Sequence, residues 1–237
     1  MKKHKGQLVG APAFPSLYAE GKKGGGYDVK IPLKGTPVFL QFKLSDILKT
    51  KNAKEHATLG LKIPYFRMHL RPLKHSQQHQ LLLDLENTGE AVYYIAPAFY
   101  RPKELDRYYL RKNVIKHSAA FSPIDIGTLP DSEEHYVVFE KNSAWGYRCS
   151  NDPTQVKRTD LEAELLILKD KDHQLGVDGL ALLSRKMLNL VRGRAPETAI
   201  NYAARADAER IAADLPPWES AGYLARNYFA SELIIVG

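Results

Sequence analysis

Apolar and polar positions alternate near the start of the chain in the pattern of paired β-strands. Residues 27–31 and 38–44 are rich in β-branched and aromatic side chains, and residues 34–37 between them form a Lys-Gly-Thr-Pro turn signal. The pattern predicts a β-hairpin. Because successive side chains of a strand point to opposite faces, Gln41 and Lys43 are expected on one face and the neighbouring apolar side chains on the other. Polar groups would then gather beside a buried strand, and a structural role on a solvated hairpin is the alternative.

The remaining elements are predicted from the same periodicities. Helices are expected over residues 45–56, 78–85 and 103–117, and strands over residues 67–70, 91–96, 135–139 and 144–149. Further helices are expected over residues 178–191, 196–214 and 218–229, and residues 233–236 form an apolar strand or a partner-binding tip. We therefore expect an α/β fold, with a core in residues 1–155 and a helical C-terminal region in residues 156–237.

Composition favours a protein that meets polyanions. The 237 residues include 34 Lys and Arg against 27 Asp and Glu, a net charge of +7, and 44% of residues are hydrophobic, enough for a sizeable core. The single cysteine, Cys149, excludes an internal disulfide and a Cys-cluster zinc site. Residues 7–15 are too short and Pro-broken for a signal-peptide core, and no apolar run approaches about 20 residues. We expect a cytoplasmic protein without a membrane span.

The pattern Asp28, Gln41-Phe42-Lys43 resembles the core of the PD-(D/E)XK nuclease superfamily. In that superfamily an acidic residue precedes a strand that carries an acid, one spacer and a lysine. Asp28 matches the first acid and Lys43 the lysine, whereas Gln41 replaces the usual Asp or Glu. Glu20 corresponds to the carboxylate that many members place on the preceding helix. The resemblance covers roughly the first hundred residues and implies a restriction-endonuclease-like mixed sheet flanked by helices.

The resemblance implies a metal-dependent nuclease that cleaves phosphodiester bonds of DNA or RNA. Mg²⁺, or Mn²⁺ in its place, would neutralise phosphate charge and activate a water, and both metals prefer oxygen ligands. Asp28, Gln41 and Glu20 are the expected ligands. Lys43 is expected to orient the attacking water and stabilise the charge that builds on the phosphate.

The segment 103–117 is the expected nucleic-acid-binding surface. It is rich in basic side chains interleaved with tyrosines, and Arg107, Arg111 and Lys112 are the candidates for phosphate contacts. Leu105, Tyr108, Tyr109 and Val114 have core-compatible spacing. A solvated helix with no ligand is the alternative for this element. A second basic face, with Lys49, Lys51 and Lys54, is expected on the helix over residues 45–56.

Two functions from different classes remain open at this point. The first is a nuclease, for which the superfamily suggests a role as a defence-system effector. The second is a non-catalytic nucleic-acid-binding or assembly module that retains a nuclease-like fold, and the replacement at Gln41 favours it. In either case the helical C-terminal region could serve a protein partner or homo-oligomer contact.

Overall fold

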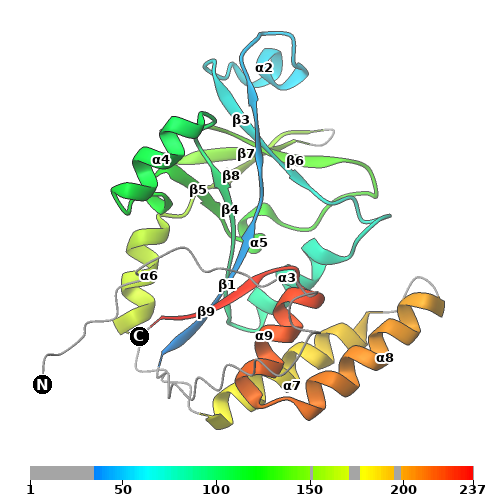
Figure 1. Ribbon diagram of the computed structural model, residues 1–237. Coiled ribbons are helices and arrows are strands. Elements are labelled where there is room, and N and C mark those ends of the chain that lie inside the picture. Colours follow the sequence, from blue (N-terminus) through cyan, green and yellow to red (C-terminus); the bar gives the residue numbers. More distant parts are fainter. Residues whose placement is uncertain (1–34, 150–151, 171–176, 195–198, 237) are drawn as a thin grey trace, which may run out of the picture. The chain divides into compact units, whose positions relative to one another are not determined.

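The computed structural model describes residues 35–149, 152–170, 177–194 and 199–236 (Figure 1). These residues belong to one compact unit, Leu33–Gly237. The unit is an α/β structure, as expected, and its described part contains two sheets, one mixed and one antiparallel. No helix in the described ranges combines the length and apolar character that a membrane crossing needs.

The mixed sheet has the strand order β5-β4-β1-β9. Strand β1, Thr36–Phe42, lies between β4, Ala91–Pro97, to which it is parallel, and β9, Glu232–Val236, to which it is antiparallel. Strand β5, Ser118–Phe121, is antiparallel to β4. The predicted hairpin of residues 38–44 with residues 27–31 is therefore wrong, because β4 and β9 occupy both sides of β1 and the predicted turn residues Thr36 and Pro37 belong to the strand. Residues 27–31 themselves lie outside the described residues.

Both faces of the mixed sheet are covered, which explains the nearly unbroken apolar run in β1. Phe39 and Tyr94 pack on the leucines of helix α3, Gln78–Asn87, in the main core. On the opposite face, Leu40 packs in a smaller cluster with helix α6, Leu161–Asp170. The Asp160 carboxylate accepts a hydrogen bond from the Ala163 amide at 3.2 Å at the start of α6. Strand β1 is therefore a central strand, but the apolar burial expected over residues 38–44 ends before Phe42 and Leu44, which are 57% and 90% exposed.

The antiparallel sheet has the order β2-β3-β6-β7-β8. Its strands are β2 Ser45–Leu48, β3 Tyr65–Leu70, β6 His135–Glu140, β7 Trp145–Cys149 and β8 Thr154–Lys157. One face, which carries Phe66, Met68 and Phe139, joins the main core. Short helix α2, Lys54–Leu59, connects β2 with β3, and it ends at Gly60, whose φ of 64° is left-handed.

The predicted helix over residues 45–56 is wrong. Residues Ser45–Leu48 pair with β3 instead, and Ile47 lies opposite Phe66 and packs on the main core. The pairing partner comes some twenty residues later along the chain and cannot be seen in the local pattern. Tertiary pairing therefore overrides the helical spacing of this segment.

The predicted helix over residues 103–117 is correct in its first half only. Helix α4 spans Pro102–Leu110, with the Glu104 carboxylate accepting a hydrogen bond from the Arg101 amide at 3.2 Å. It ends before Lys112, whose φ of 53° is left-handed, and a short 3₁₀ turn, η1, follows over Ile115–His117. A left-handed residue cannot continue a right-handed helix.

The remaining helices lie largely where the periodicity predicts them. Helix α7 spans Val177–Gly193, α8 spans Ala199–Asp214 and α9 spans Pro217–Asn227. The one-turn helix α5, Pro123–Ile126, was not predicted. Helices α7 and α9 contribute Met187 and Leu224 to the main core. After α9 the chain returns to the mixed sheet through β9, so the final apolar segment is a strand.

Candidate functional site

Gln41 and Lys43 lie on one side of the chain where β1 ends. Gln41 is opposite Tyr94 of β4 in the register, and its side chain is 8% exposed. The Lys43 amide donates to the Ile95 carbonyl at 2.8 Å, which carries the β1 to β4 pairing one residue past the strand. The predicted alternation is confirmed here, because the two polar side chains converge on a common partner.

That partner is Gln78, the first residue of α3. Its side chain is buried, its Nε2 donates to Oε1 of Gln41 at 2.7 Å, and its Oε1 accepts from Nζ of Lys43 at 3.2 Å. The Gln78 amide also donates to the Ser76 hydroxyl at 3.2 Å. One buried side chain therefore fixes both residues of the Gln41-x-Lys43 pattern in place.

The chemistry of Lys43 fixes the orientation of both amides. An ammonium only donates, so the Gln78 atom that faces Lys43 is the oxygen and its NH₂ group faces Gln41. The Gln41 atom that accepts this bond is in turn an oxygen, which leaves the Gln41 NH₂ group to donate to the Phe42 carbonyl at 3.0 Å. The three side chains form one directed network.

Gln78 was missed in the sequence because nothing in its own surroundings marks it. In a crossover between parallel strands, the helix that leads to the second strand starts beside the end of the first. A recognised crossover from residues 38–44 through residues 78–85 to residues 91–96 would have brought the start of that helix to Gln41 and Lys43.

Lys43 is a partly buried cation without a counter-ion among the described residues. Burial, with a smaller contribution from the charge of nearby Arg71, lowers its pKa to about 8. Its contacts are to the neutral Gln78 oxygen and to the ring of Tyr94, whose centroid is 5.8 Å from Nζ. No carboxylate of the described part forms an ion pair with it. A desolvated cation in this setting is stabilised by an anionic ligand.

Behind Lys43, His79 holds Tyr94 in place. The His79 Nε2 atom lies 2.8 Å from the Gly127 carbonyl, which only accepts, so Nε2 carries the hydrogen and Nδ1 accepts from the Tyr94 hydroxyl at 3.0 Å. Burial lowers the pKa of His79, which keeps the ring neutral as this pattern requires. With both nitrogens engaged, His79 has none left for a metal.

Gln41 is the only one of the three expected metal ligands that lies among the described residues. Gln41 Oε1 uses one lone pair for Gln78 and retains a second, and an amide oxygen is a neutral ligand of the kind that Mg²⁺ accepts. Within the described ranges, no cluster of three His, Cys, Asp or Glu side chains is placed to hold a metal. Asp28 and Glu20 lie outside the described residues.

Arg107 and Arg111 are exposed on and beside α4, as the phosphate-binding expectation requires. The Arg107 guanidinium lies 5.0 Å from the ring of Tyr108. Lys112 is exposed but lies past the helix end. The expected core spacing is wrong for most of this element, because Tyr108 is buried whereas Leu105 and Tyr109 are 46% and 49% exposed. The short helix contacts the fold mainly through Tyr108, which stacks on His117.

Cys149 does not act as a nucleophile in this fold. Its side chain is 3% exposed in the cluster beneath α2, and burial raises the pKa of its thiol to about 12. The thiolate, which is the reactive form, is therefore suppressed at neutral pH. Cys149 acts as a small apolar side chain of the core.

Comparison of the chain with known protein families, with curated proteins and with solved structures gave no match. Function is therefore inferred from the residues and their geometry.

Proposed function

We propose that this protein is a metal-dependent nuclease that acts on DNA or RNA, with its active site where β1 ends. The observation that carries the proposal is the desolvated ammonium of Lys43, which is held by Gln78 and has no counter-ion among the described residues. A phosphodiester supplies the missing negative charge. The negative charge on the phosphate oxygens grows as the nucleophile attacks the phosphorus atom. Lys43 therefore stabilises the transition state more than the bound substrate.

Gln41 and Gln78 position the groups that act on the phosphate. Gln78 fixes the direction of the Lys43 ammonium, and the free lone pair of Gln41 Oε1 supports a metal-ligand role. Asp28 and Glu20 supply the carboxylates in this proposal. When bound, Mg²⁺ or Mn²⁺ neutralises phosphate charge and activates a water. The superfamily resemblance extends the proposal to a restriction-endonuclease-like fold and a cytoplasmic defence-system effector.

One observation favours the alternative of a non-catalytic nucleic-acid-binding or assembly module. The Gln41 amide is already engaged on both sides, by Gln78 and by the Phe42 carbonyl, and β1 offers a neutral group where a carboxylate is usual. A fully bonded network of this kind also serves as a purely structural connection between a strand and a helix.

Cleavage assays separate the two functions. We expect the purified protein to nick or degrade at least one substrate in a panel of single-stranded and duplex DNA and RNA with Mg²⁺ or Mn²⁺, and to lose this activity in EDTA. Lys43→Ala should lower cleavage much more than substrate binding, because Lys43 acts on the transition state. Binding to the panel without any EDTA-sensitive cleavage would favour the non-catalytic module.

A further inference from the structure

All exposed charged side chains of the connection between β2 and β3 are cationic. Residues 49–64, here called the hairpin arm, expose the side chains of Lys49, Lys51, Lys54 and Lys62. Glu55 is the only acidic residue in this segment, and its side chain is buried. The arm therefore has no exposed carboxylate to pair with its lysines.

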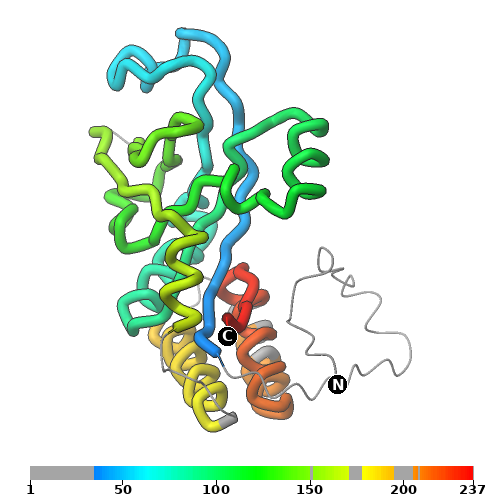
Figure 2. The backbone as a smooth tube through the Cα atoms, turned by 90° about the vertical axis from the view of Figure 1, so that its left-hand side faces the viewer, coloured from blue at the N-terminus to red at the C-terminus, as the bar shows by residue number. Residues whose placement is uncertain are grey.

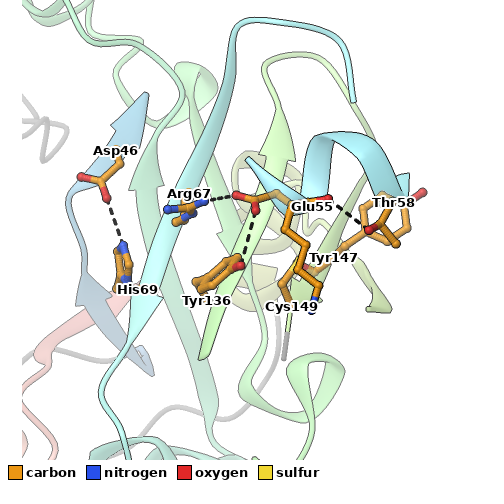
Figure 3. Close-up of polar contacts among 9 residues, drawn as sticks. Asp46, Glu55, Thr58, Arg67, His69, Tyr136, Tyr147 and Cys149 are labelled. Carbon is orange, nitrogen blue, oxygen red and sulfur yellow. Dashed lines mark hydrogen bonds and ion pairs between the residues drawn. The ribbon is translucent and has the colours of Figure 1, made fainter. Parts of the chain in front are cut away.

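Glu55 is turned inward by an ion pair with Arg67 of β3 (Figure 3). The Glu55 side chain is 3% exposed, and the Tyr136 hydroxyl of β6 donates to its second oxygen at 3.5 Å. Burial acts to raise the pKa of Glu55, but the hydrogen bond and charge of Arg67 outweigh it and leave the pKa below its usual value. Arg67 therefore neutralises the negative charge of Glu55 inside the fold, and this ion pair connects α2 to β3 of the antiparallel sheet.

The hairpin arm meets the start of α4 through Lys49 and Tyr100. The Lys49 ammonium lies 4.4 Å from the centroid of the Tyr100 ring, and the Arg101 guanidinium lies 5.2 Å from the same centroid. Tyr100 lies just before α4 and is 39% exposed. Lys49 thus links two basic surfaces that are far apart in the sequence, whereas α2 itself lies apart from α4 (Figures 1 and 2).

We propose that the hairpin arm is a second nucleic-acid-binding element, continuous with α4, and that one polynucleotide contacts both. The arm would hold the substrate of the proposed nuclease, and the substrate class rests on that proposed function. Lysine ammoniums are mobile point charges that contact phosphates without reading base edges. Binding by the arm should therefore be independent of sequence and strongly dependent on salt.

The test compares two variants with the same change in net charge. In the first, Lys51→Gln, Lys54→Gln and Lys62→Gln neutralise the arm, and Lys49 is kept because it contacts Tyr100. In the control, Lys157→Gln, Lys169→Gln and Arg185→Gln neutralise exposed positions on β8, α6 and α7. Fluorescence anisotropy with labelled oligonucleotides is recorded over a range of salt concentrations in EDTA, so that metal-dependent cleavage does not contribute.

We expect the arm variant to bind more weakly, and its plot of log affinity against log salt concentration to flatten by about 0.7–0.9 for each phosphate that the arm no longer neutralises. The control variant should keep the wild-type slope. Equal slopes for the two variants, or wild-type protein that binds anionic phospholipid vesicles but no oligonucleotide, would overturn the proposal. Because the assay needs no metal, a slope change without any cleavage supports the arm and counts against the nuclease function alone.

Discussion

The side-chain oxygen of Gln78 accepts a hydrogen bond from the Lys43 ammonium at 3.2 Å, and this bond joins the end of a strand to the start of helix α3. The same Gln78 side chain donates to Gln41 at 2.7 Å. The flexible Lys43 side chain is thereby held in one orientation before any ligand binds. This lowers the conformational entropy that is lost when the ammonium contacts a phosphate.

Gln78→Leu should therefore impair both folding and cleavage. The change leaves Gln41 without its donor and Lys43 without its acceptor, so we expect a loss of about 1–3 kcal/mol in the free energy of unfolding. Cleavage should fall roughly 10- to 100-fold, because Lys43 is no longer positioned. Gln80→Leu, on the same helix but bonded to Asp84, is the control. Equal effects of the two changes on cleavage would show that Gln78 has no special role.

The lowered pKa of Lys43 predicts a pH-dependent stability. The pKa falls from 10.5 to about 8 on folding, so the charged form is disfavoured in the folded state. Below pH 8 both states bind the proton and the full penalty is present, whereas between pH 8 and 10.5 the folded state loses the proton first and stability recovers. Lys43→Met should be more stable than wild type at pH 7, and this advantage should shrink as the pH rises through that window.

Denaturant titrations of the metal-free proteins at several pH values measure this difference. An advantage of Lys43→Met that stays constant from pH 7 to pH 10.5 would mean that Lys43 is fully solvated in the folded protein.

Breaking the ion pair beneath α2 should be costly. Glu55→Gln leaves the charge of Arg67 without its partner, and removal of one member of a buried pair costs about 3 kcal/mol. Asp46→Asn removes a carboxylate from the exposed pair with His69 on β3, and should cost less than about 1 kcal/mol. Chemical denaturation of both variants at neutral pH gives the comparison, and similar losses would rule out a special role for the Glu55 pair.

Charge reversal on α4 tests the first basic surface. Arg107→Glu with Arg111→Glu should weaken oligonucleotide binding and flatten its salt dependence by roughly one unit of slope for each phosphate that the helix no longer neutralises. Lys169→Glu with Arg185→Glu carries the same change in net charge on α6 and α7 and should leave the slope unchanged. If the α4 variant keeps the wild-type slope, α4 is a solvated helix without a nucleic-acid contact.

The sequence pattern predicts those parts of the fold that depend on local periodicity. Helix α3 and strands β3, β4, β6, β7 and β9 lie close to their expected positions, because each carries the spacing of its own buried face. The helix prediction is wrong for residues 45–48, because they form a strand by pairing with residues 65–68. The helix prediction for residues 103–117 is wrong from Lys112 onward, because Lys112 has a left-handed backbone conformation. A lysine gives no sequence signal for such a conformation.

The same contrast between local pattern and distant partners applies to the candidate site. Alternation in β1 correctly predicts that Gln41 and Lys43 share a face, since that depends only on strand geometry. Gln78 could not be found from spacing, because it reaches the site through the β1 to β4 crossover. The burial of Glu55 could not be predicted from the sequence pattern either, because its partner Arg67 lies on another element. The metal roles of Asp28, Glu20 and Gln41 remain predictions.

Calorimetric titration of Mn²⁺ into wild type, Gln41→Glu, Gln41→Leu and Asp28→Asn tests the metal site most directly. If Gln41 and Asp28 are ligands, Gln41→Glu adds a carboxylate and should bind Mn²⁺ more tightly with cleavage retained or improved, while Gln41→Leu should bind it more weakly. Asp28→Asn should be the weakest binder, because it removes a negative charge that faces the cation. Identical isotherms across the four proteins would contradict the metal site and with it the proposed nuclease mechanism.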